Sequence, residues 1–334
     1  MSTETLSLDE IETLALAALV AAGTLEQNAR DLARATAMTE ADGVASHGLA
    51  YIPIYCEHVQ CGKVDGKATP VLEHPRPGVI RVDAATGFAH PAIALGFETL
   101  IPAARELGIA ALSIRNSYNC GVLGVHTQVL AQAGLLGLGF TNAPASIAPS
   151  GGQTPLVGTN PFSLAAPDGR GGAAVLIDQS ANVIAKSEIM KHAREGKPIP
   201  EGWALDADGN PTTDPETGLA GSMAPSGGYK GVGVALMVEL MAAAMSGATL
   251  GKDASPFSGT TGGPPRTGQF FIAIDPDASS NGAFAARLAA LVDALRAQPG
   301  ARLPGDGRAV ARARAARDGV AVSSATLERI RALI

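Results

Sequence analysis

The sequence has few charged side chains, few aromatic ones and few cysteines, and each scarcity argues against a class of protein. Charged residues make up 17% of the 334 residues and aromatic residues 4%, whereas apolar residues make up 46%. Disordered chains combine low apolar content with high net charge, so this composition indicates a globular chain with a substantial core. The net charge is −6. Without an excess of positive charge to attract phosphate backbones, nucleic-acid binding is disfavoured.

Disulfides, a signal peptide and a membrane span are also not expected. The three cysteines, Cys56, Cys61 and Cys120, form no even framework and no C-x-x-C pair. Residues 1–22 carry four acidic residues and no Lys or Arg, unlike the basic start of a signal peptide. The longest apolar stretch, 232–250, is interrupted by Glu239 and does not suit a membrane span. These features predict a protein of the reducing cytoplasm that does not associate with membranes.

Several motifs that define common enzyme classes are missing. G-x-G-x-x-G, G-x-x-x-x-G-K-[ST], G-x-S-x-G and H-E-x-x-H do not occur. A nicotinamide cofactor would therefore require a fold other than the Rossmann one. Cys56, His58 and Cys61 resemble metal ligands only superficially, because they share one expected helix and no second ligand pair exists. We predict that no metal is bound.

Alternating strand and helix patterns begin near residue 78 and predict an α/β fold with a mixed sheet. Strands are expected at 79–83, 109–114, 136–141, 161–166, 174–178 and 269–274. Helices are expected at 91–107, 123–134, 183–194, 230–246, 283–297 and 324–333. The long loops at 144–161, 196–228 and 253–268 contain apolar residues and are expected to be ordered and functional. We predict a mainly helical domain from 1–77 plus 283–334 and an α/β cofactor- and substrate-binding region from 78–282.

Two capping boxes predict helix starts near the beginning of the chain. Ser7 is followed by Glu10 and Thr24 by Gln27, the S/T-x-x-E/Q pattern in which side chains satisfy free backbone N–H groups. Gly23 separates the two expected helices.

His47 is the residue best suited to acid–base chemistry. It lies between Ser46 and Gly48, after a glycine-containing turn and before an apolar segment. The pKa of histidine is near neutral, and a neighbouring hydroxyl would fix the ring tautomer, so His47 is a candidate general acid. The alternative is a histidine that only caps a turn.

Three further segments carry polar groups suited to a ligand. Asp178, Gln179 and Ser180 follow an apolar strand, the end at which α/β proteins bind ligands. Lys230 lies in a glycine-rich segment before a helix, a setting that suits phosphate, and Thr159 lies in a rigid G-T-N-P turn. The alternatives are ordinary turns and a solvated lysine.

The order of the motifs along the chain is more specific than any one of them. They are S-H-G near residue 47, N-S-x-x-x-G at 116–121, T-N followed by P-x-G-G at 141–152, G-T-N-P at 158–161, D-x-S at 178–180, G-W-A-x-D-x-x-G-x-P-T-x-D-P at 202–215, P-x-G-G-x-K-G at 225–231 and R-x-P-G at 302–305. Together they resemble the type 2 malate/L-lactate dehydrogenase family over nearly the whole chain.

The resemblance implies an NAD(P)-dependent dehydrogenase or reductase. The expected cofactor is NAD or NADP, with NADPH slightly favoured, and no acidic ribose-binding residue at a fingerprint distance decides between them. The implied substrate is a small 2-oxo or 2-hydroxy acid of the malate, lactate or sulfolactate type, or a cyclic 2-imino acid. The family includes sulfolactate dehydrogenase, ureidoglycolate dehydrogenase and Δ1-piperideine-2-carboxylate reductase. The resemblance also implies a non-Rossmann cofactor fold and a homodimer with its sites near the subunit interface.

The resemblance also assigns roles to individual residues. His47 would be the proton donor, with Ser46 beside it and Glu188 as the acidic partner of the relay. Tyr51, Asn119 and Thr159 would face the substrate. The residues expected to line the cofactor are Cys120, Gly121, Asp178, Gln179, Ser180, Tyr229, Lys230, Gly305 and Asp306.

Two positions depart from the family pattern. Family members commonly have an arginine where this chain has Tyr51, and a histidine where it has Asn119. A tyrosine phenol donates one hydrogen bond and is uncharged at neutral pH, so a dicarboxylate such as malate becomes a less favoured substrate. Another group must then bind the substrate anion, and the candidates are Arg115, His126 and Arg266.

Two other functions are compatible with parts of the sequence. Loss of the arginine and of the second histidine would suit a catalytically silent nucleotide-binding relative, but retention of His47 and Lys230 favours an enzyme. A Ser/His hydrolase is disfavoured because adjacent side chains seldom align as nucleophile and base. The arginines near the end of the chain are expected to form a solvated helix face with ion pairs rather than a partner site: Arg308, Arg312, Arg314 and Arg317.

Overall fold

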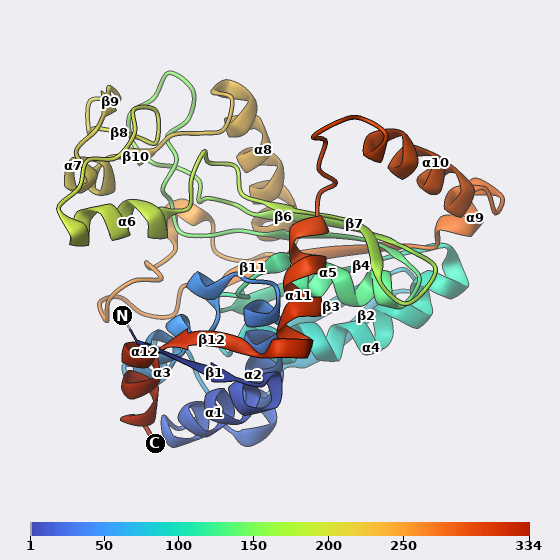
Figure 1. Cartoon of the computed structure of the whole chain (residues 1–334), viewed down its shortest axis with the longest axis horizontal. Coiled ribbons are helices and arrows are strands. Elements are labelled where there is room, and N and C mark those ends of the chain that lie inside the picture. The colour runs from blue at the N-terminus through green and yellow to red at the C-terminus, as the bar shows by residue number, and fades with distance from the viewer. Residues whose placement is uncertain (1) are drawn as a thin grey trace.

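The computed structural model describes residues 2–334, and a seven-stranded mixed sheet lies at its centre (Figure 1). The strand order is β2-β3-β4-β11-β5-β6-β7; β3 and β4 are parallel and all other neighbours are antiparallel. Every strand except β2 overlaps a predicted one. The strands are β2 (Val71–Arg76), β3 (Val79–Asp83), β4 (Ile109–Ser117), β5 (Leu136–Thr141), β6 (Phe162–Pro167), β7 (Ala173–Gln179) and β11 (Thr267–Ile274).

Helices cover both faces of the sheet, and β11 shows why. Its side chains alternate: Phe271 and Ala273 lie in a core beneath α4 (Ala89–Leu107) and α5 (Leu123–Gln132). Phe270 and Ile272 lie on the opposite side with α8 (Tyr229–Glu239) and its π-helical continuation, Leu240–Ala244. A central strand buried on both faces is expected to be a continuous apolar run, as the sequence Phe-Phe-Ile-Ala-Ile at 270–274 of β11 is.

The two ends of the chain meet in a helical region beside the sheet (Figure 1). Strand β1 (Thr3–Leu6) pairs antiparallel with β12 (Val320–Ser323). Around this pair, α1, α2, α3 and α12 share one core: α1 (Leu8–Ala21), α2 (Glu26–Ala41), α3 (Ile52–Gln60) and α12 (Ser324–Arg331). Helix α10 (Phe284–Arg296) lies apart from them next to α9 (Pro276–Ser280). The domain boundaries at 77 and 283 stay a prediction.

The long segment between β7 and α8 forms a small lobe with its own core. It contains α6 (Lys186–Glu195), α7 (Pro215–Ala220) and a three-stranded sheet of β8 (Ala204–Leu205), β9 (Pro211–Thr212) and β10 (Ser222–Met223). Ile189, Ile199 and Met223 are buried there. The expectation that residues 196–228 are ordered is confirmed. Their strands could not be predicted from hydrophobic periodicity, because two residues are too few to show a repeat.

One of the two predicted capping boxes is correct. At α1, the Ser7 backbone N–H donates to Glu10 Oε2 at 2.7 Å and the Glu10 N–H donates to Ser7 Oγ at 3.2 Å. The box at Thr24 is wrong, because the residue that precedes α2 is Leu25 and no side chain caps the helix. The Thr24 N–H instead closes the end of α1 on the Leu19 carbonyl, and its side chain packs against Gly66.

The remaining elements are short or irregular. The expected helix at 230–246 changes to π-helical geometry at Leu240. Helix α11 (Asp306–Asp318) follows the R-x-P-G segment, and three 3₁₀ turns are η1 (Ala45–His47), η2 (Leu49–Tyr51) and η4 (Gly251–Asp253). Across residues 2–334, no helix has the length and apolar character that a membrane crossing requires.

The central sheet gives a stability prediction. Phe271 is fully buried, and its ring contacts Phe97 of α4 edge to face at a centroid distance of 5.1 Å. Phe271→Ala should lower the free energy of unfolding by about 3–5 kcal/mol because a cavity opens between sheet and helix. Urea denaturation followed by circular dichroism measures this change. Leu107→Ala, at a 45% exposed position, is the control and should change it by less than about 0.5 kcal/mol. Equal effects would contradict the assignment of β11 to the core.

Candidate active site

His47 lies at the end of η1, in a double turn that leads from α2 to α3. The His47 N–H donates to the Val44 carbonyl at 3.0 Å, and the Tyr51 N–H donates to the Gly48 carbonyl at 2.9 Å. Ser46 Oγ lies 2.9 Å from His47 Nδ1, so the hydroxyl and the ring share a hydrogen bond. This contact is the local arrangement expected of a hydroxyl that orients a catalytic imidazole.

Two opposing effects act on the pKa of His47. Burial lowers the pKa of His47 because the charged imidazolium loses hydration, and the Asp178 carboxylate acts in the opposite direction. The neutral ring is thus favoured at neutral pH more than in free histidine, which makes the bound proton easier to donate.

Aromatic side chains form one side of the His47 environment. The Tyr51 ring is parallel to the His47 ring, with centroids 6.0 Å apart and an interplanar angle of 5°, and Tyr55 lies 4.8 Å from Tyr51. Burial raises the pKa of Tyr51 to about 12, so its phenol stays neutral at physiological pH. Tyr51 can therefore donate one hydrogen bond to a substrate, but it supplies no positive charge.

The segment from Asn119 to Gly121 lies against Tyr55. Asn119 Oδ1 accepts a hydrogen bond from the Gly121 N–H at 2.6 Å, and Gly121 has a left-handed backbone with φ = 66°. A Cβ atom on Gly121 would lie 3.7 Å from the Tyr55 hydroxyl. Burial raises the pKa of Cys120 to about 12, so its thiol is protonated and does not act as a nucleophile.

Asp178 at the end of β7 is ion-paired with Arg308 of α11. Arg308 Nη2 donates to Asp178 Oδ2 at 2.7 Å, and Arg308 Nη1 lies 3.6 Å from Asp42 Oδ2. Gly124 permits this pair, because a Cβ there would come 2.5 Å from Arg308 Nη1 and 2.6 Å from Asp178 Oδ2. Among residues 2–334, Arg308 Nη1 has no hydrogen-bond acceptor although it is buried.

The expectation of a solvated arginine face on α11 is wrong for Arg308 and Arg312. Both pair with Asp42, whose side chain is only 1% exposed. Helix α11 is therefore docked on α2 and β7 through a partly buried ion-pair network, whereas Arg317 pairs with its exposed neighbour Asp318. The sequence could not reveal this because Asp42 lies more than 260 positions before the arginines.

The other residues of the predicted cofactor and relay sets are spread over several elements. The Ala181 N–H donates to the Thr159 carbonyl at 2.8 Å, so Thr159 lies beside the end of the Asp178–Ser180 segment. Tyr229 and Lys230 start α8 and are exposed, and Gly305 precedes α11, with φ = 99°. Glu188 lies on α6, 4.0 Å from Lys191, and Asp306 lies 3.4 Å from Arg296. The roles of these residues, and of Gln179, remain predictions.

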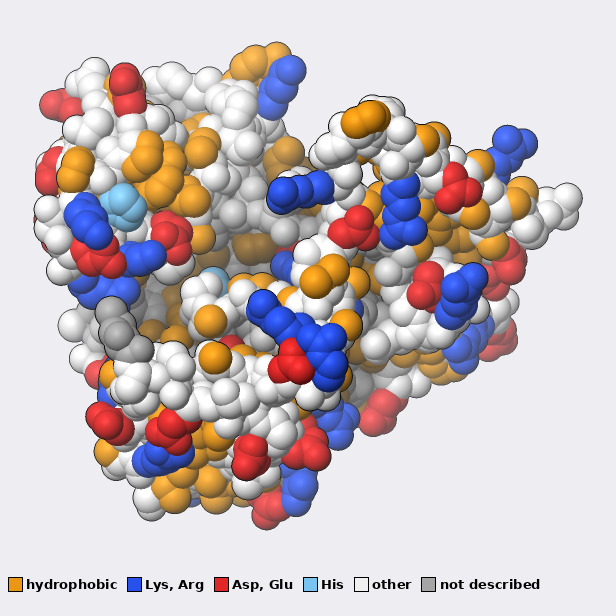
Figure 2. Space-filling view, in the orientation of Figure 1, with side chains coloured by type: hydrophobic (Ala, Val, Ile, Leu, Met, Phe, Trp, Pro, Cys, Tyr) orange, Lys and Arg blue, Asp and Glu red, His pale blue; other side chains and the backbone are white. Residues whose placement is uncertain are grey.

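The face of the molecule in Figure 2 is hollowed between the lobe that carries α6 and α7 and the region that carries α11. Backbone and other uncharged groups, with hydrophobic side chains among them, make up most of the visible depth of this hollow. Concave surfaces with a small number of polar groups are typical of small-molecule sites.

The three candidates for the substrate anion are not equally placed. Arg115 is ion-paired with Asp83 at 3.1 Å and half exposed. His126 is buried and its Nε2 donates to the Cys120 carbonyl at 2.8 Å. Arg266 precedes β11 in the left-handed region, with φ = 51°. Arg308, which the sequence analysis did not consider as a ligand group, is the cation nearest to Asp178.

The cysteine–histidine segment serves the packing of α3. Cys56 is buried and its thiol lies 3.5 Å from the Ala18 carbonyl, while His58 bonds the Tyr118 hydroxyl and the Gly259 carbonyl. No group of three or more His, Cys, Asp or Glu side chains arranged to hold a metal ion occurs in the part of the chain that the structure describes.

Comparison with known proteins identifies the class of the molecule as an oxidoreductase. A (2R)-3-sulfolactate dehydrogenase (NADP(+)) of Chromohalobacter salexigens is 46% identical over 91% of this chain and 90% of the relative. A Δ1-pyrroline-2-carboxylate reductase of Ancylobacter novellus is 41% identical over 98% of this chain and 97% of the relative. The crystal structure of Δ1-piperideine-2-carboxylate reductase from Pseudomonas syringae pvar. tomato has a TM-score of 0.93 at 38% identity and covers 99% of this chain and 100% of that one.

The family can also be stated. The malate/L-lactate dehydrogenase family profile matches residues 6–331, and the chain belongs to that family. The resemblance drawn from the order of the motifs is confirmed, and the chain is an NAD(P)-dependent dehydrogenase or reductase rather than a Ser/His hydrolase.

The charge of Asp178 gives a prediction for His47. Asp178→Asn removes the negative charge that opposes the effect of burial, so the pKa of His47 should fall further below its ordinary value. NMR titration of the histidine ring protons measures this, with the His47 resonance assigned by its absence in His47→Ala. Asp208→Asn, which removes an exposed carboxylate in the small lobe, is the charge-matched control and should leave that pKa unchanged. A rise in the Asp178→Asn variant would contradict the argument.

Proposed function

We propose that the protein is an NADP-linked reductase that adds hydride to the C=N or C=O carbon next to a carboxylate, with His47 as proton donor. The observation that carries the proposal is the Ser46–His47 pair, hydrogen-bonded at 2.9 Å in a half-buried turn beside aromatic side chains. The π bond of the substrate breaks as hydride bonds to carbon, and the proton of His47 goes to the nitrogen or oxygen. The Asp178 carboxylate favours the protonated ring that this step consumes.

Residues around Asp178 suit a phosphate-bearing cofactor. Helix α5 begins at Leu123 without a side-chain cap, and buried Arg308 Nη1 lies against Gly124 in its first turn without a hydrogen-bond acceptor. A helix N-terminus and a guanidinium nitrogen without a hydrogen-bond acceptor suit an anion, and exposed Lys230 begins α8. When bound, a reduced nicotinamide supplies the hydride. The NADP(+) in the name of the sulfolactate relative supports NADPH over NADH.

The proposal includes a cofactor fold other than the Rossmann one and a homodimer. The missing G-x-G-x-x-G motif and the mainly antiparallel sheet support the first. Exposed apolar side chains on α8 and its continuation support the second, because such patches mark contact surfaces: Leu236, Met237, Leu240 and Met245.

Tyr51 favours a cyclic 2-imino acid as substrate. It is neutral, aromatic and parallel to His47, so it suits the apolar ring of such a substrate better than a second negative charge. Several curated relatives are named Δ1-pyrroline-2-carboxylate reductases, and one is a sulfolactate dehydrogenase. Sulfopyruvate is therefore the second candidate, which the relative at 46% identity favours.

The proposal is tested by oxidation of NADPH and NADH, followed by loss of absorbance. The panel is Δ1-pyrroline-2-carboxylate, Δ1-piperideine-2-carboxylate, sulfopyruvate, oxaloacetate and pyruvate. We expect turnover of the cyclic imines with NADPH, and a rate that falls as pH rises through the lowered pKa of His47, because only the protonated ring donates. His47→Ala should lower kcat by about 10²–10⁴-fold with cofactor binding intact.

Three outcomes would decide against the proposal or a part of it. Turnover of oxo acids alone would replace the imine assignment with a hydroxy-acid dehydrogenase. Full activity in His47→Ala would remove the role of His47 as proton donor. Silence across the panel with NADPH still bound would remove the proposed function itself.

Tyr51 supplies a prediction about selectivity. Tyr51→Arg introduces a guanidinium that can bind a carboxylate with two hydrogen bonds, a gain of about 1.5–3 kcal/mol. We expect kcat/KM for oxaloacetate to rise about tenfold or more and kcat/KM for the cyclic imines to fall. Tyr51→Phe, which removes only the hydroxyl, is the matched control and should not raise oxaloacetate turnover. A rise in both variants would show that charge at this position does not set selectivity.

A further inference from the structure

Glu40 is a buried carboxylate beneath the turn that carries His47. It lies near the end of α2 and is 6% exposed. Its Oε1 accepts a hydrogen bond from the Leu49 N–H at 2.7 Å, two residues after His47. Burial raises the pKa of Glu40, and the Leu49 N–H opposes that rise.

Gly48 is shaped to receive this carboxylate. A Cβ atom on Gly48 would come 2.2 Å from Glu40 Oε1 and 2.6 Å from its Cδ, closer than real atoms approach. The Glu40 side chain is buried and has little room to move aside. Any larger residue at position 48 would therefore displace Glu40 or the turn. The glycine of the S-H-G motif is therefore explained by Glu40 and not only by the backbone.

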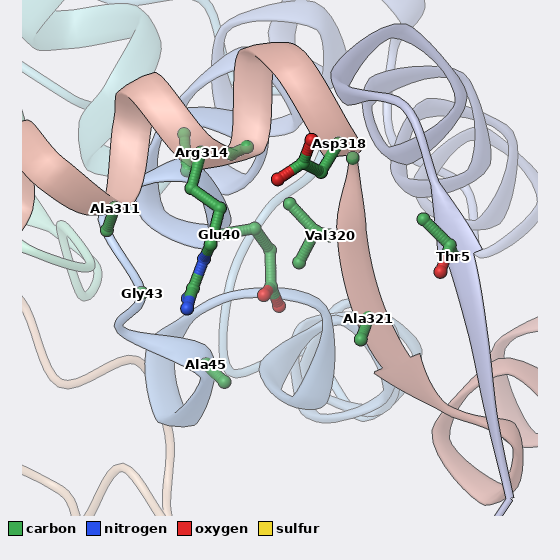
Figure 3. Close-up of a pocket in the computed structure, with 12 residues that line it drawn as sticks. Thr5, Glu40, Gly43, Ala45, Ala311, Arg314, Asp318, Val320 and Ala321 are labelled. Atoms are coloured by element: carbon green, nitrogen blue, oxygen red, sulfur yellow. The ribbon is translucent and has the colours of Figure 1, made fainter.

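A pocket of about 450 Å³ reaches Glu40 from the side of α11 (Figure 3). Gly43 and Ala45 of the turn line it, but His47 does not. Figure 3 shows the Glu40 carboxylate directed toward the turn, with Arg314 alongside and Asp318 above. These are the charged groups that α11 presents to Glu40. The pocket thus gives the buried Glu40 side chain an opening on the side of α11.

We propose that Glu40 is a positioning residue for the proton donor: it holds the Gly48–Leu49 backbone and thereby fixes the His47 ring at the depth where it donates. This inference rests on the proposed function of His47. Glu40 acts through the backbone, because burial and Asp178, not Glu40, are the causes that shift the pKa of His47. A hydrogen bond to a buried side chain of another element suits a turn that must not move.

Three variants separate positioning from folding. Glu40→Ala removes the acceptor, Glu40→Gln keeps an oxygen of the same reach, and Asn28→Ala is the control. Asn28 lies on the same helix, is 5% exposed, and donates to the Gly66 and Ala68 carbonyls, away from His47. The measurements are thermal stability, NADPH affinity, kcat and KM for the substrate that turns over, and the pH dependence of kcat.

We expect Glu40→Ala to lower kcat by about 10- to 100-fold, because a displacement of about 1 Å at the reacting group has effects of that size. Its NADPH affinity should be unchanged. The pH at which kcat falls, here called the pH limb, should move upward, because the released His47 ring gains hydration and its pKa is no longer lowered. Glu40→Gln should lower kcat by about threefold and move the limb in the same direction by a smaller amount, because the amide oxygen is the weaker acceptor. Asn28→Ala should lose stability but keep kcat and the pH limb.

The outcomes distinguish this proposal from the function it rests on. If His47→Ala is inactive while Glu40→Ala keeps kcat and the pH limb, only the positioning role is overturned. Equal losses of kcat in Glu40→Ala and Asn28→Ala, with no movement of the limb, would assign Glu40 to folding alone. If Glu40→Ala does not fold, the kcat and the pH limb of Glu40→Gln decide. A moved limb supports positioning, because the amide oxygen is the weaker acceptor. Equality with the parent in both quantities overturns the positioning role.

Discussion

The carboxylate of Asp42 holds together the parts of the chain that form the site. It follows α2, its side chain is 1% exposed, and it binds Arg308 and Arg312 of α11. Arg308 in turn binds Asp178 on β7. Removing one member of a buried ion pair costs about 3–5 kcal/mol, and the partial exposure of the arginines places this network at the lower end. Asp42 is also the residue at which α2 ends and the segment leading to His47 begins. The site therefore depends on the docking of α11, near the end of the chain, against α2, near its start.

The replacement of a guanidinium by a phenol at position 51 changes what the site must do elsewhere. An arginine there would offer the substrate two charged hydrogen bonds, whereas Tyr51 offers one neutral hydrogen bond and a flat surface parallel to His47. The negative charge of a substrate carboxylate must then be balanced by backbone N–H groups or by a cation. Arg308 is already shared between Asp42 and Asp178, so any anion it binds must compete with two carboxylates. This competition favours a substrate with one carboxylate over one with two.

The local parts of this architecture could be predicted from the sequence, and the long-range parts could not. The six predicted strands and the helices at 91–107 and 123–134 have apolar residues at regular spacing or in continuous runs. In β11 a continuous apolar run indicates that the strand is buried. Strand β2 was missed because it is an exposed edge strand that contains Pro75. Thr24 matched a capping pattern, yet contact with Gly66 determined its role. His47 and Ser46 are neighbours in sequence and could be paired at once, whereas Asp42, Asp178 and Arg308 meet only in the fold.

The position of His47 shows why such an acid needs a rigid support. Burial lowers its pKa and the Asp178 carboxylate opposes that effect, and both effects depend steeply on where the ring lies. A ring that moved outward would regain hydration and lose the influence of Asp178 together, so its acidity would drift toward that of free histidine. Tyr51 limits one side of the ring and Ser46 holds one nitrogen, but both belong to the same turn and would move with it. A fixed ring therefore requires a contact from outside the turn, and the Glu40 hydrogen bond to Leu49 is such a contact.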